Sequence, residues 1–152
     1  MKPIAVLRLT VALTISLALG ACVGPARTTS AYNGKAVQAA DSALSEVQTV
    51  RLTVRLSLAG KLQQAYLETV LTNSETAIAS VQNSFDSIQP PDTDTADKLR
   101  SDLDQQLSDG SDTISQLRIA ARRQDTDQLR SLLASLDPVA SKLQAFSSEH
   151  GG

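Results

Sequence analysis

The sequence predicts an all-α protein that folds as an antiparallel up-down-up-down four-helix bundle. From Asn33 onward, apolar residues recur in steps of three and four, and no strand-like alternation interrupts them. Breaks at Gly60, at Pro90-Pro91 and near Asp125 divide this region into four segments. Because short connections place consecutive helices next to each other in opposite directions, we expect a bundle of this topology.

The first two helices are recognised by their ends. The first ends at Gly60, since glycine readily adopts the backbone conformation that follows a helix. The second ends at Pro90-Pro91, because a residue before proline is disfavoured in the helical conformation. The first apolar stripe is Ala40, Leu44, Val47, Val54 and Leu58, and the second is Leu67, Leu71, Ser74, Ile78, Val81, Phe85 and Ile88.

The third helix is recognised by its start, where Asp92, Thr93 or Asp94 can cap the first turn. Gly110 lies within it and marks either a close helix contact or a weak turn, and we expect the weak turn. The stripe of this helix is Ala96, Leu99, Leu103, Leu107, Ile114, Leu117 and Ala121.

The fourth helix begins near Asp125, which together with Gln128 resembles a capping box. Its stripe is Leu129, Leu132, Leu136, Val139, Leu143 and Phe146. Pro138 interrupts the stripe, and we expect either a kink or a restart of the helix with Asp137 as its cap. The tail from Ser147 to Gly152 is expected to fray.

The N-terminal segment has the pattern of a secretory signal. Lys2 and Arg8 accompany an apolar run from Ile4 to Leu19, which ends in the small residues Gly20 and Ala21. A membrane-spanning helix needs about 20 apolar residues, whereas this run is shorter and contains Arg8. Cleavage is therefore favoured over spanning.

Cys22, the only cysteine, follows this run directly, and Leu19-Gly20-Ala21-Cys22 resembles the lipobox of bacterial lipoproteins. The resemblance implies a diacylglyceryl group, with acyl chains such as palmitate, on the Cys22 sulfur and cleavage before Cys22. Two acyl chains are enough for stable membrane anchoring. An ordinary cleavable signal with a coincidental cysteine is the alternative.

The resemblance also implies a location outside the cytoplasm. Val23 is not the Asp that is associated with retention at the inner membrane. We therefore expect the outer membrane in a diderm bacterium and the outer face of the cell membrane in a monoderm. The expected organisation is a signal peptide at 1–21, the lipidated cysteine and a flexible tether at 22–32, the four-helix bundle at 33–148 and a frayed tail at 149–152.

A faint internal duplication connects the two halves of the bundle. An offset of 67 residues aligns Val47 with Ile114, Val50 with Leu117, Leu52 with Ile119, Leu62 with Leu129, Arg51 with Arg118 and Arg55 with Arg122. If the first and third helices are parallel across the bundle diagonal, these four arginines lie at one level.

Arginine suits bidentate recognition of carboxylate or phosphate, so Arg51, Arg55, Arg118 and Arg122 are a candidate site for a small anion. The alternative is that they pair with acidic residues on the facing helices or cover apolar surface. The acidic residues at suitable heights are Glu68, Glu75, Asp127 and Asp137.

The composition argues against catalysis. The chain has one His and one Cys, and it contains neither a zinc-binding pattern nor a phosphate-cradling glycine loop. We therefore expect no catalytic residues, no metal, no cofactor and no enzymatic activity. The net charge of −2 gives no reason to expect nucleic acid as a partner.

Two functions remain open from the sequence. The favoured one is a lipid-anchored, extracytoplasmic helical-bundle protein that serves as a structural or protein-interaction module of the cell envelope. Its partners would be the membrane, through the lipid on Cys22, and an envelope protein. The alternative is a bundle that binds or senses a small anion or other solute through its arginines.

Overall fold

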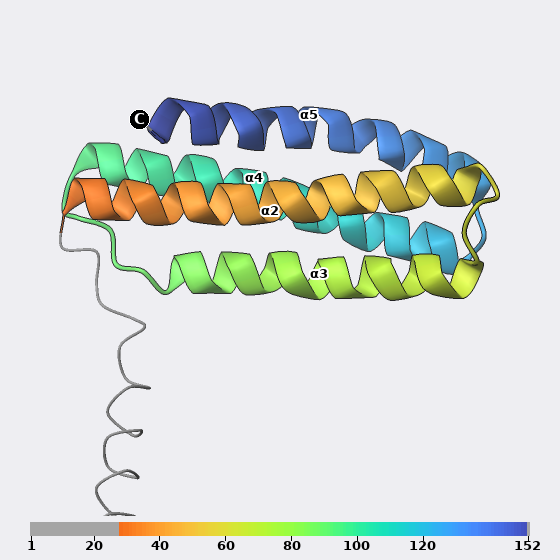
Figure 1. Ribbon diagram of the computed structural model, residues 1–152. Coiled ribbons are helices and arrows are strands. Elements are labelled where there is room, and N and C mark those ends of the chain that lie inside the picture. Colours follow the sequence, from red (N-terminus) through yellow and green to blue (C-terminus); the bar gives the residue numbers. More distant parts are fainter. Residues whose placement is uncertain (1–27, 152) are drawn as a thin grey trace, which may run out of the picture.

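The computed structural model describes residues 28–151, which form four α-helices (Figure 1). These are α2 (Thr29–Leu58), α3 (Gln64–Asp86), α4 (Asp94–Arg122) and α5 (Thr126–His150). No strand occurs in this part of the chain. The predicted fold class, an all-α four-helix bundle, is confirmed.

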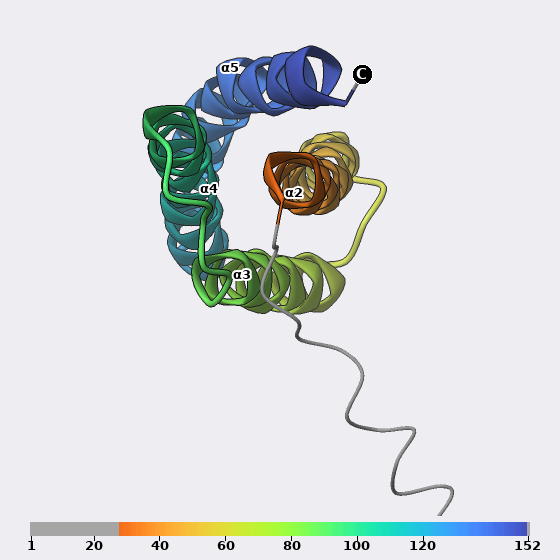
Figure 2. The ribbon, with the colours of Figure 1, turned by 90° about the vertical axis from the view of Figure 1, so that its left-hand side faces the viewer.

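The helices run up and down, with their connections at alternate ends of the bundle (Figure 1). Viewed end-on, α3, α4 and α5 form an arc with α2 on its inner side (Figure 2). The backbones of α2 and α4 each contact every other helix, whereas the backbones of α3 and α5 do not contact each other. The parallel pair α2 and α4 therefore forms the short diagonal of the bundle.

Three side chains cap the starts of helices. Thr28 Oγ1 accepts a hydrogen bond from the Ala31 amide (3.2 Å), and Thr93 Oγ1 accepts one from the Ala96 amide (3.2 Å). Asp125 Oδ1 accepts one from the Gln128 amide (2.9 Å). Each bond satisfies an amide that has no partner within its own helix. The caps at Thr93 and Asp125 confirm two predicted starts.

The predicted boundary between tether and bundle, at residue 33, is wrong. With Thr28 as its cap, α2 already begins at Thr29, and Tyr32 is fully buried. The apolar stripe continues backward from Ala40 through Ala36 to Tyr32 in steps of four, so these small and aromatic residues belong to the core.

Two helices end with the same hydrogen-bond pattern. After α2, the Gly60 amide donates to the Ser57 carbonyl (2.9 Å) and the Lys61 amide donates to the Leu56 carbonyl (2.9 Å). This arrangement is a Schellman motif, and it places Gly60 at φ 69°, which confirms the predicted stop. After α4 the same pattern puts Gln124 at φ 55°.

The C-terminal helix continues through Pro138, so the predicted restart with Asp137 as a cap is wrong. Proline removes the donor to the carbonyl four residues earlier, and the axis of α5 curves (Figure 1). The helix ends at His150, beyond the predicted boundary at 148. The His150 ring packs on Phe146 at a centroid distance of 4.5 Å, which supports the last turn.

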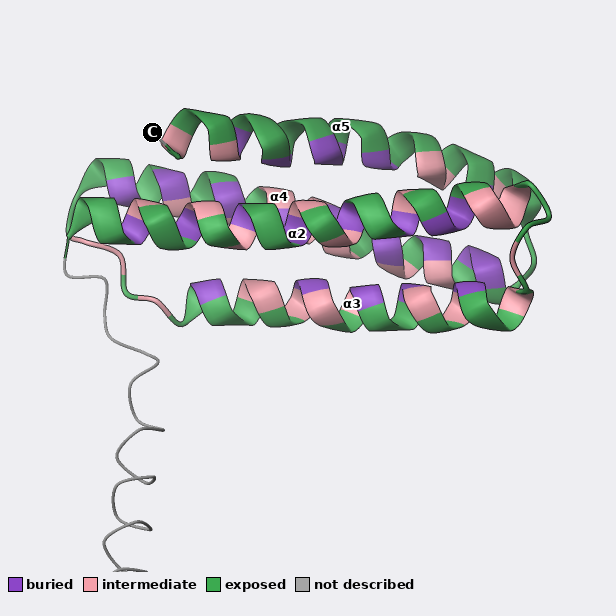
Figure 3. Ribbon diagram, viewed as in Figure 1, coloured by how far each residue is buried: buried purple, intermediate pink, exposed green. Residues whose placement is uncertain are grey.

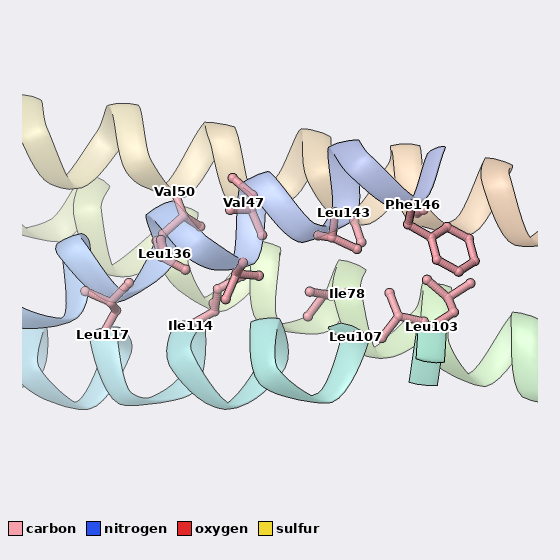
Figure 4. Close-up of a cluster of buried hydrophobic side chains, with 14 of the residues drawn as sticks. Val47, Val50, Ile78, Leu103, Leu107, Ile114, Leu117, Leu136, Leu143 and Phe146 are labelled. Carbon is pink, nitrogen blue, oxygen red and sulfur yellow. The ribbon is translucent and has the colours of Figure 1, made fainter. Parts of the chain in front are cut away.

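The inward faces of all four helices form one hydrophobic core (Figures 3 and 4). Every predicted stripe residue of α4 is buried. On the other helices Leu44, Leu58, Val81 and Leu132 of the predicted stripes are only partly buried. Ile88 is also partly buried, but it follows the end of α3 at Asp86, which comes before the predicted end at Pro90-Pro91. The prediction missed Tyr32, Ala36, Ala43 and Val50, which are fully buried.

Gly110 lies at the centre of the core, so the expected weak turn is wrong and the alternative of a close helix contact holds. A Cβ atom at this position would lie 2.9 Å from Ile78 Cδ1, 3.5 Å from Val139 Cγ1 and 3.9 Å from Val47 Cγ2. These atoms come from the three other helices, so the missing side chain allows α4 to approach all of them.

The 67-residue offset relates the buried faces of α2 and α4. It pairs every buried residue of α2 with a buried residue of α4, from Tyr32 with Leu99 to Val54 with Ala121. The proposed match of Leu62 with Leu129 fails, because Leu62 lies in the connection before α3 and Leu129 is buried in α5.

Gln124 gives a stability prediction. A side chain in the left-handed conformation costs roughly 1 kcal/mol, a cost that glycine avoids. We expect Gln124→Gly to raise the free energy of unfolding by about 1 kcal/mol, measured by urea denaturation followed by helical circular dichroism. The matched control is Arg123→Gly, at the preceding position with φ −83°, which should not stabilise. Equal effects of both substitutions would contradict this explanation.

Candidate functional site

The predicted lipid attachment residue, Cys22, and the predicted signal at 1–21 lie outside the described residues. Among residues 28–151, no helix combines the length and the apolar character that crossing a bilayer requires. The candidate site residues within the described part are the four arginines of α2 and α4.

Arg51 and Arg55 converge on one carboxylate in the groove between α2 and α5. Arg51 Nη2 forms an ion pair with Asp137 Oδ1, and Arg51 Nη1 donates to Gln48 Oε1 (2.9 Å). Arg55 Nη2 lies 3.9 Å from the same Asp137 oxygen. The Arg51 side chain is only 18% exposed, and its Nε is buried without a hydrogen-bond partner among the described residues.

Arg118 is engaged in the groove between α3 and α4. Its Nε and Nη2 both donate to the Glu75 carboxylate, the latter over 3.2 Å. The hydrogen bond from Arg118 holds the pKa of Glu75 below its ordinary value, and a hydrogen bond with Ser115 adds to this effect. Arg122, one turn further along α4, is exposed.

The four arginines therefore do not form one cluster. Arg51 pairs with Asp137 of α5 and Arg118 pairs with Glu75 of α3, and the backbones of α3 and α5 do not contact each other. The alternative that the arginines pair with acids is confirmed for Glu75 and Asp137. Glu68 instead accepts a hydrogen bond from Gln64 (2.8 Å), and Asp127 pairs with Arg130 (2.9 Å).

A second cluster of polar side chains, which was not predicted from the sequence, lies at the opposite end of the bundle. We call Tyr32, Asp86, Arg100 and Asp104 the Tyr32 cluster. Arg100 donates to the backbone carbonyls of Asp86 (2.9 Å) and Ile88 (3.4 Å), where α3 ends. Its Nη2 lies 3.8 Å from Asp86 Oδ1, and its Nε lies 3.8 Å from Asp104 Oδ2.

Burial shapes the chemistry of the Tyr32 cluster. The Tyr32 hydroxyl and Asp104 Oδ1 are buried and have no hydrogen-bond partner among the described residues. Burial raises the pKa of Tyr32. Burial, and then the hydrogen bond and charge of Asp86, raise the pKa of Asp104 to about 6, against an opposing effect of Arg100. The sequence signal was the i,i+4 pair of Arg100 and Asp104 beside core residues.

The surface of the described residues carries hollows that are wide open to solvent. One open hollow lies along α3, one lies along α2, and one lies between α3 and α4 beside Arg100 and Asp104. Within residues 28–151, no group of three or more His, Cys, Asp or Glu side chains could hold a metal ion.

No model of a known protein family matches this chain, and no curated protein or solved structure is significantly similar to it. The function is therefore inferred from the residues and the geometry of this chain.

The engaged arginines lead to a prediction about anions. Because carboxylates of the bundle already occupy Arg51 and Arg118, we expect sulfate, phosphate and small carboxylates to cause no specific rise in melting temperature. A site at 100 times its dissociation constant would add about 2.7 kcal/mol to the free energy of unfolding. A rise that Arg51→Ala abolishes and the exposed control Arg123→Ala retains would contradict this expectation.

The Glu75 carboxylate gives a prediction about acid stability. Its pKa is lower in the folded chain than its ordinary value of 4.5, so its contribution is present above pH 4.5 and is lost as the pH falls further. Glu75→Gln should therefore lower the melting temperature at pH 7 but have less effect at pH 3. The exposed residue Glu149 provides the control Glu149→Gln, for which we expect no such pH-dependent difference.

Proposed function

We propose that this chain is a lipid-anchored, extracytoplasmic helical-bundle protein that acts as a structural or protein-interaction module of the cell envelope. The anchor rests on the resemblance of Leu19-Gly20-Ala21-Cys22 to a lipobox. With Thr28 as the cap of the first helix, only residues 23–27 separate Cys22 from the bundle. These residues span at most about 18 Å when extended, so the bundle would stay close to the membrane surface.

The interaction role is supported by two observations: the interior of the bundle is filled by apolar side chains, and two of its arginines are already paired with acids. The inward faces pack into one apolar core, and Arg51 and Arg118 are bound to carboxylates of the bundle itself. The hollows found on the surface are open. The outer surface is thus the part of the described chain that is best placed for recognition.

The non-catalytic part of the proposal rests on the sequence. The single histidine, His150, packs on Phe146 in the last turn of α5. The single cysteine would be consumed by the lipid.

Three large apolar side chains are exposed in the half of the bundle that lies away from the start of α2. Leu52 is 59% exposed, Tyr66 is 57% exposed and Ile119 is 37% exposed. They come from the end of α2, the start of α3 and the end of α4. In an anchored protein this half would point away from the lipid, where partner proteins can reach it.

The anchor is tested by mass spectrometry of the full chain after expression in a bacterium. We expect the mature protein to begin at Cys22, to carry a diacylglyceryl group and to fractionate with membranes. Cys22→Ala should abolish both the modification and the cleavage. The double variant Cys22→Ala, Ser30→Cys controls for the mere presence of a cysteine and should not restore either. Cleavage at another position with an unmodified Cys22 would contradict the anchor.

The interaction role is tested by crosslinking in intact cells. We expect one defined envelope protein to be recovered with the wild-type chain and lost in at least one of Leu52→Ser, Tyr66→Ser and Ile119→Ser. The exposed neighbours provide the controls Thr49→Ser, Thr69→Ser and Gln116→Ser, which should retain it. Circular dichroism verifies that each variant is folded. Failure to recover any defined partner with the wild-type chain would contradict this role.

A further inference from the structure

We propose that Asp104 and Asp86 share one proton across the groove between α3 and α4, which makes the Tyr32 cluster a pH-sensitive clasp. With the proton bound, the Asp104 carboxyl donates to the Asp86 carboxylate and ties α4 to the last turn of α3. Without it, the two carboxylates repel each other. This inference concerns residues within the bundle and does not depend on the lipid anchor.

The first argument is a shortage of positive charge. Two carboxylates face one guanidinium, and Arg100 lies 3.8 Å from an oxygen of each. Hydrogen bonds from N–H to oxygen span about 2.7–3.2 Å, so neither carboxylate receives one from Arg100. Its short hydrogen bond goes to the Asp86 backbone carbonyl instead, at 2.9 Å. Arg100 therefore caps α3 more than it neutralises the acids.

The second argument is that a buried oxygen of Asp104 lacks a hydrogen-bond donor. Asp104 Oδ1 is buried without a partner among the described residues, and a buried carboxylate oxygen that accepts no hydrogen bond is costly. A proton removes the charge of Asp104 and supplies a donor that Asp86 can accept. The other groups near the cluster are Tyr32 from α2 and Asp97 from α4, and Asp97 adds further negative charge.

The direction of the pKa change supports the shared proton. The folded chain raises the pKa of Asp104 from its ordinary 3.8 to about 6, so between these values the folded chain holds a proton that the unfolded chain has released. The stabilising contribution of this group is present below pH 3.8 and is lost as the pH rises to about 6. Glu75 acts in the opposite direction, below pH 4.5.

The position of the cluster determines what a change of pH would do. Tyr32 lies in the first turns of α2, its ring packs on Phe85 near the end of α3, and Asp104 belongs to α4. Loss of the proton therefore weakens the end of the bundle at which the chain enters from the predicted tether. The far end, with the Glu75–Arg118 pair, contains no such shared proton.

The test is carbon NMR titration of the side-chain carboxyl groups of the full chain in detergent micelles, from pH 3.5 to 8. Asp104 is assigned as the signal missing in Asp104→Asn. We expect a midpoint near pH 6 in the wild type and a clearly lower midpoint in Asp86→Asn. Asp112→Asn, an exposed change on the same helix, should leave the midpoint unchanged.

Two results would overturn the shared proton. An Asp104 midpoint near 3.8 in the wild type would show that the folded chain does not hold the proton. A midpoint near 6 that Asp86→Asn leaves unchanged would show that burial alone raises it. Asp86 is exposed, so its substitution by Asn should not prevent folding.

The effect on the bundle is measured independently by urea denaturation. We expect Asp104→Asn to raise the urea midpoint relative to the wild type at pH 7.5 and to change it less at pH 4.5, because the lost charge is absent at the lower pH. Asp112→Asn should show no such difference between the two pH values. An equal effect of Asp104→Asn at both pH values would overturn the clasp.

Discussion

The central position of α2 and α4, each of which contacts all three other helices, is the constraint on which the rest of the structure depends. The backbones of α3 and α5 do not come into contact, so the backbone contacts that hold each of them come from α2 and α4. Small residues make this central position possible, since α2 contributes Ala36, Ala40 and Ala43 to the core and α4 contributes Gly110. Interiors pack densely, so a larger side chain at Gly110 would displace groups from the three other helices.

The diagonal formed by α2 and α4 also decides what the arginines can do. Arg51 lies beside the buried stripe of α2 and faces α5, and Arg118 lies beside the buried stripe of α4 and faces α3. Both guanidinium groups therefore meet a carboxylate from across the bundle, Asp137 or Glu75. Partly exposed ion pairs add little to stability. Their main consequence is chemical, because Arg51 Nη2 and the Nε and Nη2 of Arg118 already donate to carboxylates of the bundle.

The two ends of the bundle differ in character, and this difference bears on the proposed location at a membrane. The end where the chain enters holds the Tyr32 cluster, in which buried polar atoms lack partners. The other end exposes Leu52, Tyr66 and Ile119. An anchored bundle of this kind would place a proton-sensitive group near the lipid and apolar side chains away from it.

The sequence by itself determined the fold class, most of the helix ends and most of the core, because these follow from local periodicity and from residues such as Gly60 that act on their own backbone. Every residue of the predicted α4 stripe is buried, although the stripe did not include the buried Ala120. Thr28 and Tyr32 were missed because the predicted start of the bundle, at residue 33, lay beyond them. Only the tertiary structure decided which acids meet Arg51 and Arg118, and that Asp86 of α3 lies near Arg100 of α4. Such partners lie far apart in the chain, and a rotation of one helix about its axis would change them without altering the sequence pattern.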